Sequence, residues 1–84
     1  MKKLFISMQI LGKEDEEILH EKQKAIRRVK SLIKDKVQVT DSLLTADIAY
    51  FAIGWNKTRV GKIEHEICVH YGIPTIEASI VGEE

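Results

Sequence analysis

The chain has 84 residues, of which 44% are hydrophobic and 31% are charged, a composition typical of one folded domain. Its 13 basic residues balance its 13 acidic residues, and a net charge of zero argues against nucleic acid or an anionic membrane as a partner. Because a chain of this length buries only roughly 60% of its unfolded surface, we expect a single domain, residues 1–84, that forms a homo-oligomer.

Cys68 is the single cysteine, so the sequence provides neither an internal disulfide nor a cysteine cluster for zinc. This usage is typical of a reducing cytosol. The first apolar run, residues 4–8, is too short for a signal peptide or a membrane span. We therefore expect a cytoplasmic protein.

The first predicted elements are a strand and a long helix. Residues 4–8 are apolar without alternation, which predicts a strand covered on both faces. The acidic segment 13–17 predicts a helix amino terminus with Asp15 as its N-cap, because carboxylates stabilise the positive end of the helix dipole. The apolar stripe of this helix consists of Ile18, Leu19, Ala25, Ile26, Val29, Leu32 and Ile33.

The second half of the chain repeats the alternation of strand and helix. Residues 37–40 alternate in polarity and predict a short edge strand beside the first strand, whereas the apolar run 48–53 predicts the central strand. A second helix is expected over about residues 58–71, ended by Gly72 and the proline beyond it, and a last short strand opens at residues 75–76. Strands that alternate with helices predict an α/β fold with a parallel sheet and right-handed crossovers.

Ligands of open parallel sheets bind beyond the carboxyl ends of the strands. Residues 7–9 and 54–56 are predicted to form that edge. Trp55 could stack on a base, although a packing role at an oligomer interface is an equal alternative, and Asn56 could form hydrogen bonds. Gly12 and Gly61 could let the backbone approach a phosphate, but neither belongs to a dinucleotide or Walker fingerprint.

Glu64 is the unusual residue of the second predicted helix. A helical wheel places it, with Cys68, inside or at the edge of the apolar side. A carboxylate on the core side is costly unless it is paired. Glu64 is therefore predicted either to project into a ligand site, as a nucleophile, a base or an acceptor for sugar hydroxyls, or to reach solvent or pair with Arg59 or Lys57. The apolar side itself is formed by Val60, Ile63, Ile67 and Tyr71.

The other reactive side chains of this helix receive structural interpretations. His65 and His70 point about 140° apart around a helix and cannot share one metal ion, so we interpret both as surface residues and predict no metal site. Cys68 has no evident base beside it and is interpreted as a buried structural thiol.

Three parts of the chain resemble a family of small bacterial and phage proteins that is similar to nucleoside 2-deoxyribosyltransferases. They are residues 5–7 with Gly12, residues 46–51 with Gly54 and Trp55, and residues 61–74, the most specific part. The resemblance covers most of the chain. It implies a small three-layer, Rossmann-like or flavodoxin-like fold with about four parallel strands in the order 2-1-3-4, truncated by the loss of one crossover helix before the third strand.

The resemblance also implies roles for individual residues. In the transferases, a glutamate in the helix before a glycine-hydrophobic-proline turn attacks the anomeric carbon of the sugar, and Glu64 matches it by its spacing to Pro74. The segment after the third strand would lie near the base, and the first strand and the turn after it would contact sugar or phosphate. The implied ligand-binding residues are Phe5, Ser7, Gln9, Gly12, Gly54, Trp55, Asn56, Gly61 and Glu64.

The sequence departs from these enzymes in its second acidic residue, which Asp41 matches only loosely. A domain that keeps one of the two groups can bind without turnover. We therefore expect a protein, without a cofactor, that binds a nucleotide or nucleoside-derived molecule, such as an ADP-ribose-like molecule or a cyclic nucleotide signal, in a pocket near a subunit interface. A phage sponge that sequesters an immune signal in an infected bacterium would fit this size. The alternatives are an N-glycosidic transferase or hydrolase with Glu64 as nucleophile, and an interaction module without a small-molecule ligand.

Overall fold

The structure is a computed structural model that describes residues 1–8 and 12–78. In this part of the chain, strands and helices alternate, as predicted. The elements in chain order are β1 (Lys2–Ser7), α1 (Asp15–Ile33), β2 (Val37–Val39), the 3-10 helix η1 (Leu43–Thr45), β3 (Ile48–Phe51), the 3-10 helix η2 (Trp55–Lys57), α2 (Arg59–Tyr71) and β4 (Thr75–Glu77).

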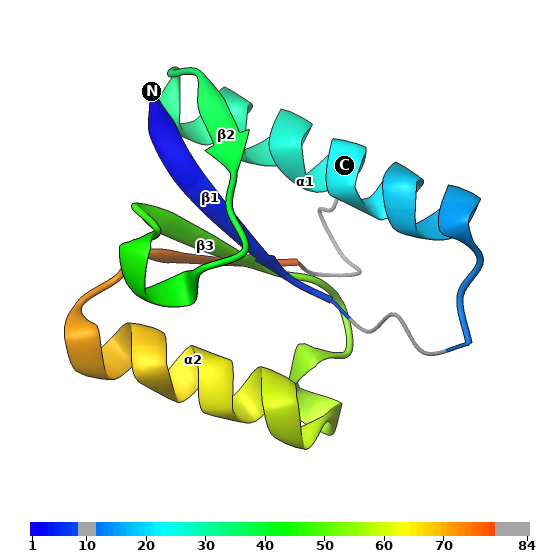
Figure 1. Cartoon of the computed structure of the whole chain (residues 1–84). Coiled ribbons are helices and arrows are strands. Elements are labelled where there is room, and N and C mark those ends of the chain that lie inside the picture. The colour runs from blue at the N-terminus through cyan, green and yellow to red at the C-terminus, as the bar shows by residue number, and fades with distance from the viewer. Residues whose placement is uncertain (9–11, 79–84) are drawn as a thin grey trace.

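The sheet confirms the predicted α/β fold and strand order. The four strands pair in parallel in the order β2-β1-β3-β4, so β2 lies at one edge and β1 and β3 in the centre. All four residues of β3 are buried. Figure 1 shows α1 on one face of the sheet and α2 on the other, which gives three layers.

Alternation of side chains along the strands divides the core between the two faces. Leu4, Val29 and Tyr50 pack together under α1, whereas Phe51 and Cys68 pack together under α2. Each helix thus covers its own apolar cluster.

The register aligns three residues at the carboxyl edge of the sheet. Ser7 of β1 pairs with Phe51 of β3, and Phe51 pairs with Glu77 of β4. All three side chains contact α2 or the cluster under it. This row is the foundation of the candidate site.

Helix α1 corrects two predictions. Its N-cap is Glu14, not Asp15, because the Glu14 backbone N–H donates to the Glu17 carboxylate (3.1 Å) while Asp15 already has helical backbone geometry. Leu19 and Leu32 of the predicted stripe are 56% and 51% exposed. Both lie at the margins of the stripe, and the sheet covers a narrower arc of the helix than the stripe spans.

Helix α2 begins and ends as predicted. The Thr58 hydroxyl accepts a hydrogen bond from the backbone N–H of Gly61 (3.0 Å) and caps the first turn. At the other end, Gly72 has the left-handed geometry (φ 71°) that glycine adopts without strain, and its N–H donates to the Cys68 carbonyl.

The buried side of α2 differs from the predicted one. Gly61 and Cys68 are buried, whereas Val60, Ile63 and Tyr71 are 64%, 50% and 68% exposed. The helical wheel correctly grouped the apolar side chains of α2 on one arc. The sheet, however, packs against the neighbouring arc, which contains Gly61 and Cys68.

The connection from β2 to β3 passes on the same face as α2, where Leu43 of η1 packs against the cluster of Phe51 and Cys68. It contains η1 in place of an α-helix. As expected, this connection contains no crossover α-helix, and α2 is the α-helix that covers this face in the described chain.

Candidate active site or ligand site

Glu64 points toward the sheet, as the helical wheel predicted. The Ser7 hydroxyl donates a hydrogen bond to Glu64 Oε1 over 2.6 Å. Ser7 is buried and Glu64 is half-buried. The contact joins the carboxyl end of central strand β1 to the amino-terminal half of α2, at the edge where parallel sheets bind their ligands. The role of Glu64 toward a ligand stays a prediction.

Close packing around Gly61 fixes the position of Glu64. A Cβ added at Gly61 would lie 2.2 Å from the carbonyl oxygen of Trp55, so α2 starts directly against η2. The Thr58 hydroxyl reinforces this junction, because it donates to the same carbonyl (3.2 Å). The absence of a side chain at Gly61 thus serves packing, and the space that we expected for a phosphate is occupied by the chain itself.

Three aromatic rings lie beside the Ser7–Glu64 pair. The rings of Trp55 and His65 are stacked, with centroids 4.2 Å apart and planes inclined by 16°, and Phe51 meets both rings edge to face. One face of the Trp55 indole is therefore covered by His65. A base that stacks on Trp55 would have to use the opposite face.

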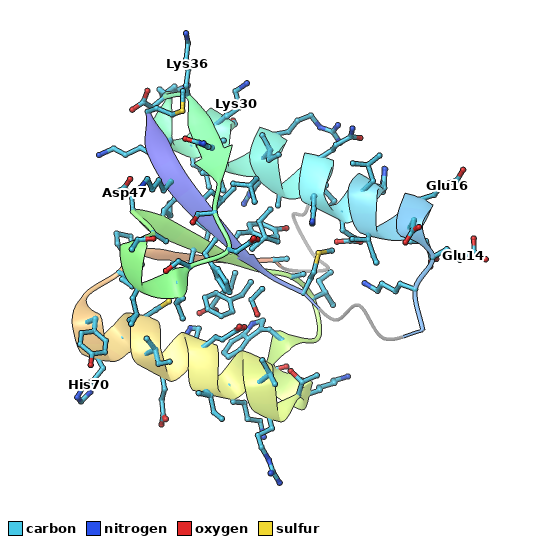
Figure 2. All side chains as sticks on the ribbon, viewed as in Figure 1. Glu14, Glu16, Lys30, Lys36, Asp47 and His70 are labelled. Carbon is cyan, nitrogen blue, oxygen red and sulfur yellow. The ribbon has the colours of Figure 1, made fainter. Side chains whose placement is uncertain are left out.

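His65 is not the surface residue that we predicted. Its side chain is 23% exposed, and its Nε2 lies 2.6 Å from Glu77 Oε2, at the end of β4. His70 is exposed, as predicted, and points away from the sheet (Figure 2). Sequence reasoning missed the His65–Glu77 pair; the signal that could have found it is the position of His65 on the arc of Gly61 and Cys68.

The site carries negative charge next to a buried thiol. Burial raises the pKa of Cys68, and the negative charge of Glu64 raises it further. Glu77 adds a second carboxylate at the same edge of the sheet. A thiol held protonated is a poor nucleophile, which agrees with the structural interpretation of Cys68.

The remaining predicted site residues lie at different distances from the Ser7–Glu64 pair. Phe5 lies two residues before Ser7 in β1, so its side chain is on the same face of the sheet, where it packs against the cluster of Phe51 and Cys68. Gly54 (φ 95°) allows the sharp turn from β3 into η2. Gly12 leads into α1, which packs on the opposite face of the sheet, so the structure does not bring it to Glu64. Gln9 lies outside the described residues.

Two grooves flank the site. One, of about 620 Å³, lies on the outer side of α2 and is lined by Trp55, Asn56 and Arg59, among others. The other, of about 310 Å³, lies at the carboxyl ends of β1 and β2 and contains Phe5 and Asp41. Asn56 and Asp41 therefore line two different grooves.

Comparisons with protein families, with curated proteins and with solved structures found no match. Neither α-helix in the described part of the chain has the length and apolarity needed to cross a membrane. Within residues 1–8 and 12–78, no three His, Cys, Asp or Glu side chains are grouped as metal ligands. The geometry of the site therefore carries the functional argument.

Proposed function

We propose that this chain is a Rossmann-like domain, similar to nucleoside 2-deoxyribosyltransferases, that binds a nucleoside-derived small molecule and leaves it unchanged. The observation that carries the proposal is the hydrogen bond from Ser7 to Glu64 at the carboxyl edge of the sheet. Ser7 occupies one carboxylate oxygen. Within the described residues the other oxygen accepts no hydrogen bond, so it is available for a ligand hydroxyl.

The charges of the site favour a ribose at Glu64. A carboxylate accepts strong hydrogen bonds from sugar hydroxyls, whereas the carboxylates of Glu64 and Glu77 at one sheet edge would repel a phosphate. We therefore infer that the sugar contacts Glu64 and that any phosphate of the ligand lies farther from α2. Sequestration of a nucleotide signal, as by a phage sponge, is the biological role that we propose for such binding.

Cleavage of an N-glycosidic bond is the second candidate, and the His65–Glu77 pair favours it. Glu64 would attack the anomeric carbon, the bond to the base would break, and the base would leave with a proton from an acid; water would then release the sugar from Glu64. A histidine oriented by a carboxylate can serve as that acid. His65 points about 100° from Glu64 around α2, so the ligand would have to span both side chains.

Native mass spectrometry with a panel of nucleosides, nucleotides, NAD and ADP-ribose tests the proposal. We expect at least one ligand to be retained unchanged. Glu64→Gln should weaken its affinity by about 1 to 3 kcal/mol, roughly 5- to 150-fold, because the charged acceptor is lost. Glu16→Gln is the matched control, since Glu16 is exposed and extends from α1 away from the sheet (Figure 2).

The same experiment distinguishes the two functions. Release of free base by the wild-type protein, lost in Glu64→Gln, would establish the enzyme and contradict capture. Equal affinity of Glu64→Gln and the wild-type protein would reject the role of Glu64 in capture, and release of base by Glu64→Gln at the wild-type rate would reject its role as the nucleophile.

A further inference from the structure

The groove on the outer side of α2 combines apolar surface with positive charge. Its volume is about 620 Å³, and we call it the α2 groove. Four of its residues follow one another at helical spacing on one face of α2, and the other two belong to η2. The residues that line it are Trp55, Asn56, Arg59, Lys62, Ile63 and Glu66.

Positive charge gathers where α2 begins, although it opposes the stability of the helix there. Lys57 ends η2, Arg59 is the first residue of α2, and Lys62 follows three residues later. Helix α2, which the structure describes in full, has no acidic residue in its first turn, whereas the first turn of α1 is acidic. Because the amino end of a helix dipole is positive, cations at this end are unfavourable. Helix stability therefore does not explain these charges.

Arg59 and Lys62 are available to a ligand. Both are exposed, and within residues 1–8 and 12–78 neither side chain forms a hydrogen bond or an ion pair. They lie about 4.5 Å apart along the helix axis and on the same groove, so one anionic group can contact both. An anion bound there would also lie near the positive end of the helix dipole.

Trp55 gives the groove an aromatic surface. His65 covers one face of the indole, and Phe51 meets it edge to face. Trp55 is nevertheless only half-buried and lines the groove, so part of its ring remains uncovered. Ile63, which is 50% exposed, adds apolar surface from α2. An aromatic ring packs favourably against such surfaces.

We propose that the α2 groove is a second binding site, for a small aromatic phosphate monoester. The ring packs against Trp55 and Ile63, and the phosphate contacts Arg59 and Lys62. A phosphate monoester carries a charge of about −1.5 to −2 at neutral pH, which two cations balance better than they balance a singly charged carboxylate. The planar guanidinium of Arg59 also presents paired N–H donors that fit phosphate oxygens.

The α2 groove is separate from the Ser7–Glu64 pair. Glu64 follows Arg59 by five residues and therefore points about 140° away from it around the helix, toward Ser7. The second site thus does not rest on the proposed function. Glu66 lines the groove about 10 Å along the helix from Arg59, and its carboxylate disfavours ligands with a second anionic group at that end.

Fluorescence titration with phenyl phosphate tests the second site, because Trp55 is the single tryptophan of the chain. We expect a saturable change of the Trp55 emission at millimolar concentrations. Arg59→Gln should raise the dissociation constant at least fivefold, since the charged donors are lost. Arg28→Gln, at an exposed position of α1, is the control and should leave it unchanged. The absence of a saturable change, or equal effects of the two variants, would overturn the proposal.

Two fragments of the probe separate the two parts of the site. Inorganic phosphate and phenol, each measured by competition with phenyl phosphate, should bind at least tenfold more weakly than phenyl phosphate. Equal affinity for inorganic phosphate would overturn the contact of the ring with Trp55 and Ile63. Equal affinity for phenol would overturn the role of Arg59 and Lys62.

Two further variants test where the probe binds, and circular dichroism verifies that each retains the fold. Glu66→Gln should bind phenyl phosphate more tightly, because it removes a repulsive carboxylate from the groove; weaker binding would contradict this location. Glu64→Gln should bind phenyl phosphate as the wild-type protein does. A loss as large as that of Arg59→Gln would locate the probe at the Ser7–Glu64 pair and overturn the second site, whatever the result with nucleosides.

Discussion

At the scale of single residues, the pKa of Cys68 depends on the charge of Glu64. The thiol is completely buried and follows Glu64 by one helical turn. Burial, the larger cause, and the negative charge of Glu64 both raise the pKa of Cys68 above its ordinary value of 9.0. As the pH rises through that value, the unfolded chain loses the proton first, so Cys68 contributes stability that is lost at alkaline pH.

Glu64→Gln should therefore lower the pKa of Cys68, but not to its ordinary value, because burial remains. Titration of the thiolate absorbance in the ultraviolet measures the change. Glu66→Gln is the control, since Glu66 lies on the opposite side of α2 and is exposed. Identical titrations of both variants would show that the Glu64 carboxylate does not act on the thiol.

The site contains two side-chain pairs, Ser7–Glu64 and His65–Glu77, and they were not equally predictable from the sequence. The direction of Glu64 was predictable, because helical periodicity places it with Cys68 at the edge of the apolar arc, next to the arc of α2 that packs on the sheet. The His65–Glu77 contact depends on the register of β4 against β3, which aligns Glu77 with Phe51. That register is a property of the assembled sheet, and no local pattern in the chain contains it.

At the scale of elements, the junction between η2 and α2 is closely packed. The backbone of Gly61 packs directly on the Trp55 carbonyl, and Thr58 bonds to both segments. Glu64 follows Gly61 by one turn, so this junction sets the height of its carboxylate above Ser7.

Gly61→Ala should destabilise the protein by about 1 to 3 kcal/mol through overpacking, although alanine is the better helix former by about 1 kcal/mol. The measurement is the free energy of unfolding in urea. Val69→Ala, at a position of α2 that is 69% exposed, is the control and should be close to neutral. A Gly61→Ala protein as stable as this control would refute the close approach to Trp55.

The order and type of the helices and strands could be predicted from the sequence. Which neighbours each face of a helix packs against could not. Apolar runs and the turn before Pro74 identified the strands and the end of α2. The wheel of α2 was misleading about Val60 and Ile63, because an apolar arc can face a sheet, a second helix or a partner subunit, and periodicity does not distinguish these neighbours. The N-cap was displaced by one residue because Glu14 and Asp15 are both acidic.

At the scale of the whole molecule, the balance of charge controls colloidal behaviour. The isoelectric point is about 6.8, so at neutral pH copies of the chain do not repel each other through net charge. Lys36, which extends away from the protein in Figure 2, contributes to this balance without contributing to the site.

We expect the turbidity of concentrated solutions to peak near the isoelectric point and to fall on either side. Lys36→Glu should shift the peak to lower pH, because it replaces a positive charge with a negative one. Lys36→Arg, which preserves the charge, is the control. A peak that Lys36→Glu leaves in place would show that association is governed by a local surface and not by net charge.

The central place of β1 in the sheet has a consequence for the order of folding. Synthesis delivers β1 first, yet both strands that pair with it come later, β2 after α1 and β3 after η1. Each parallel pair, from Ala49 with Thr75 to Leu4 with Ile48, closes a long loop of chain. Such a high contact order slows folding relative to a helical bundle of equal size, and the nascent strand β1 leaves the ribosome before any of its partners exists.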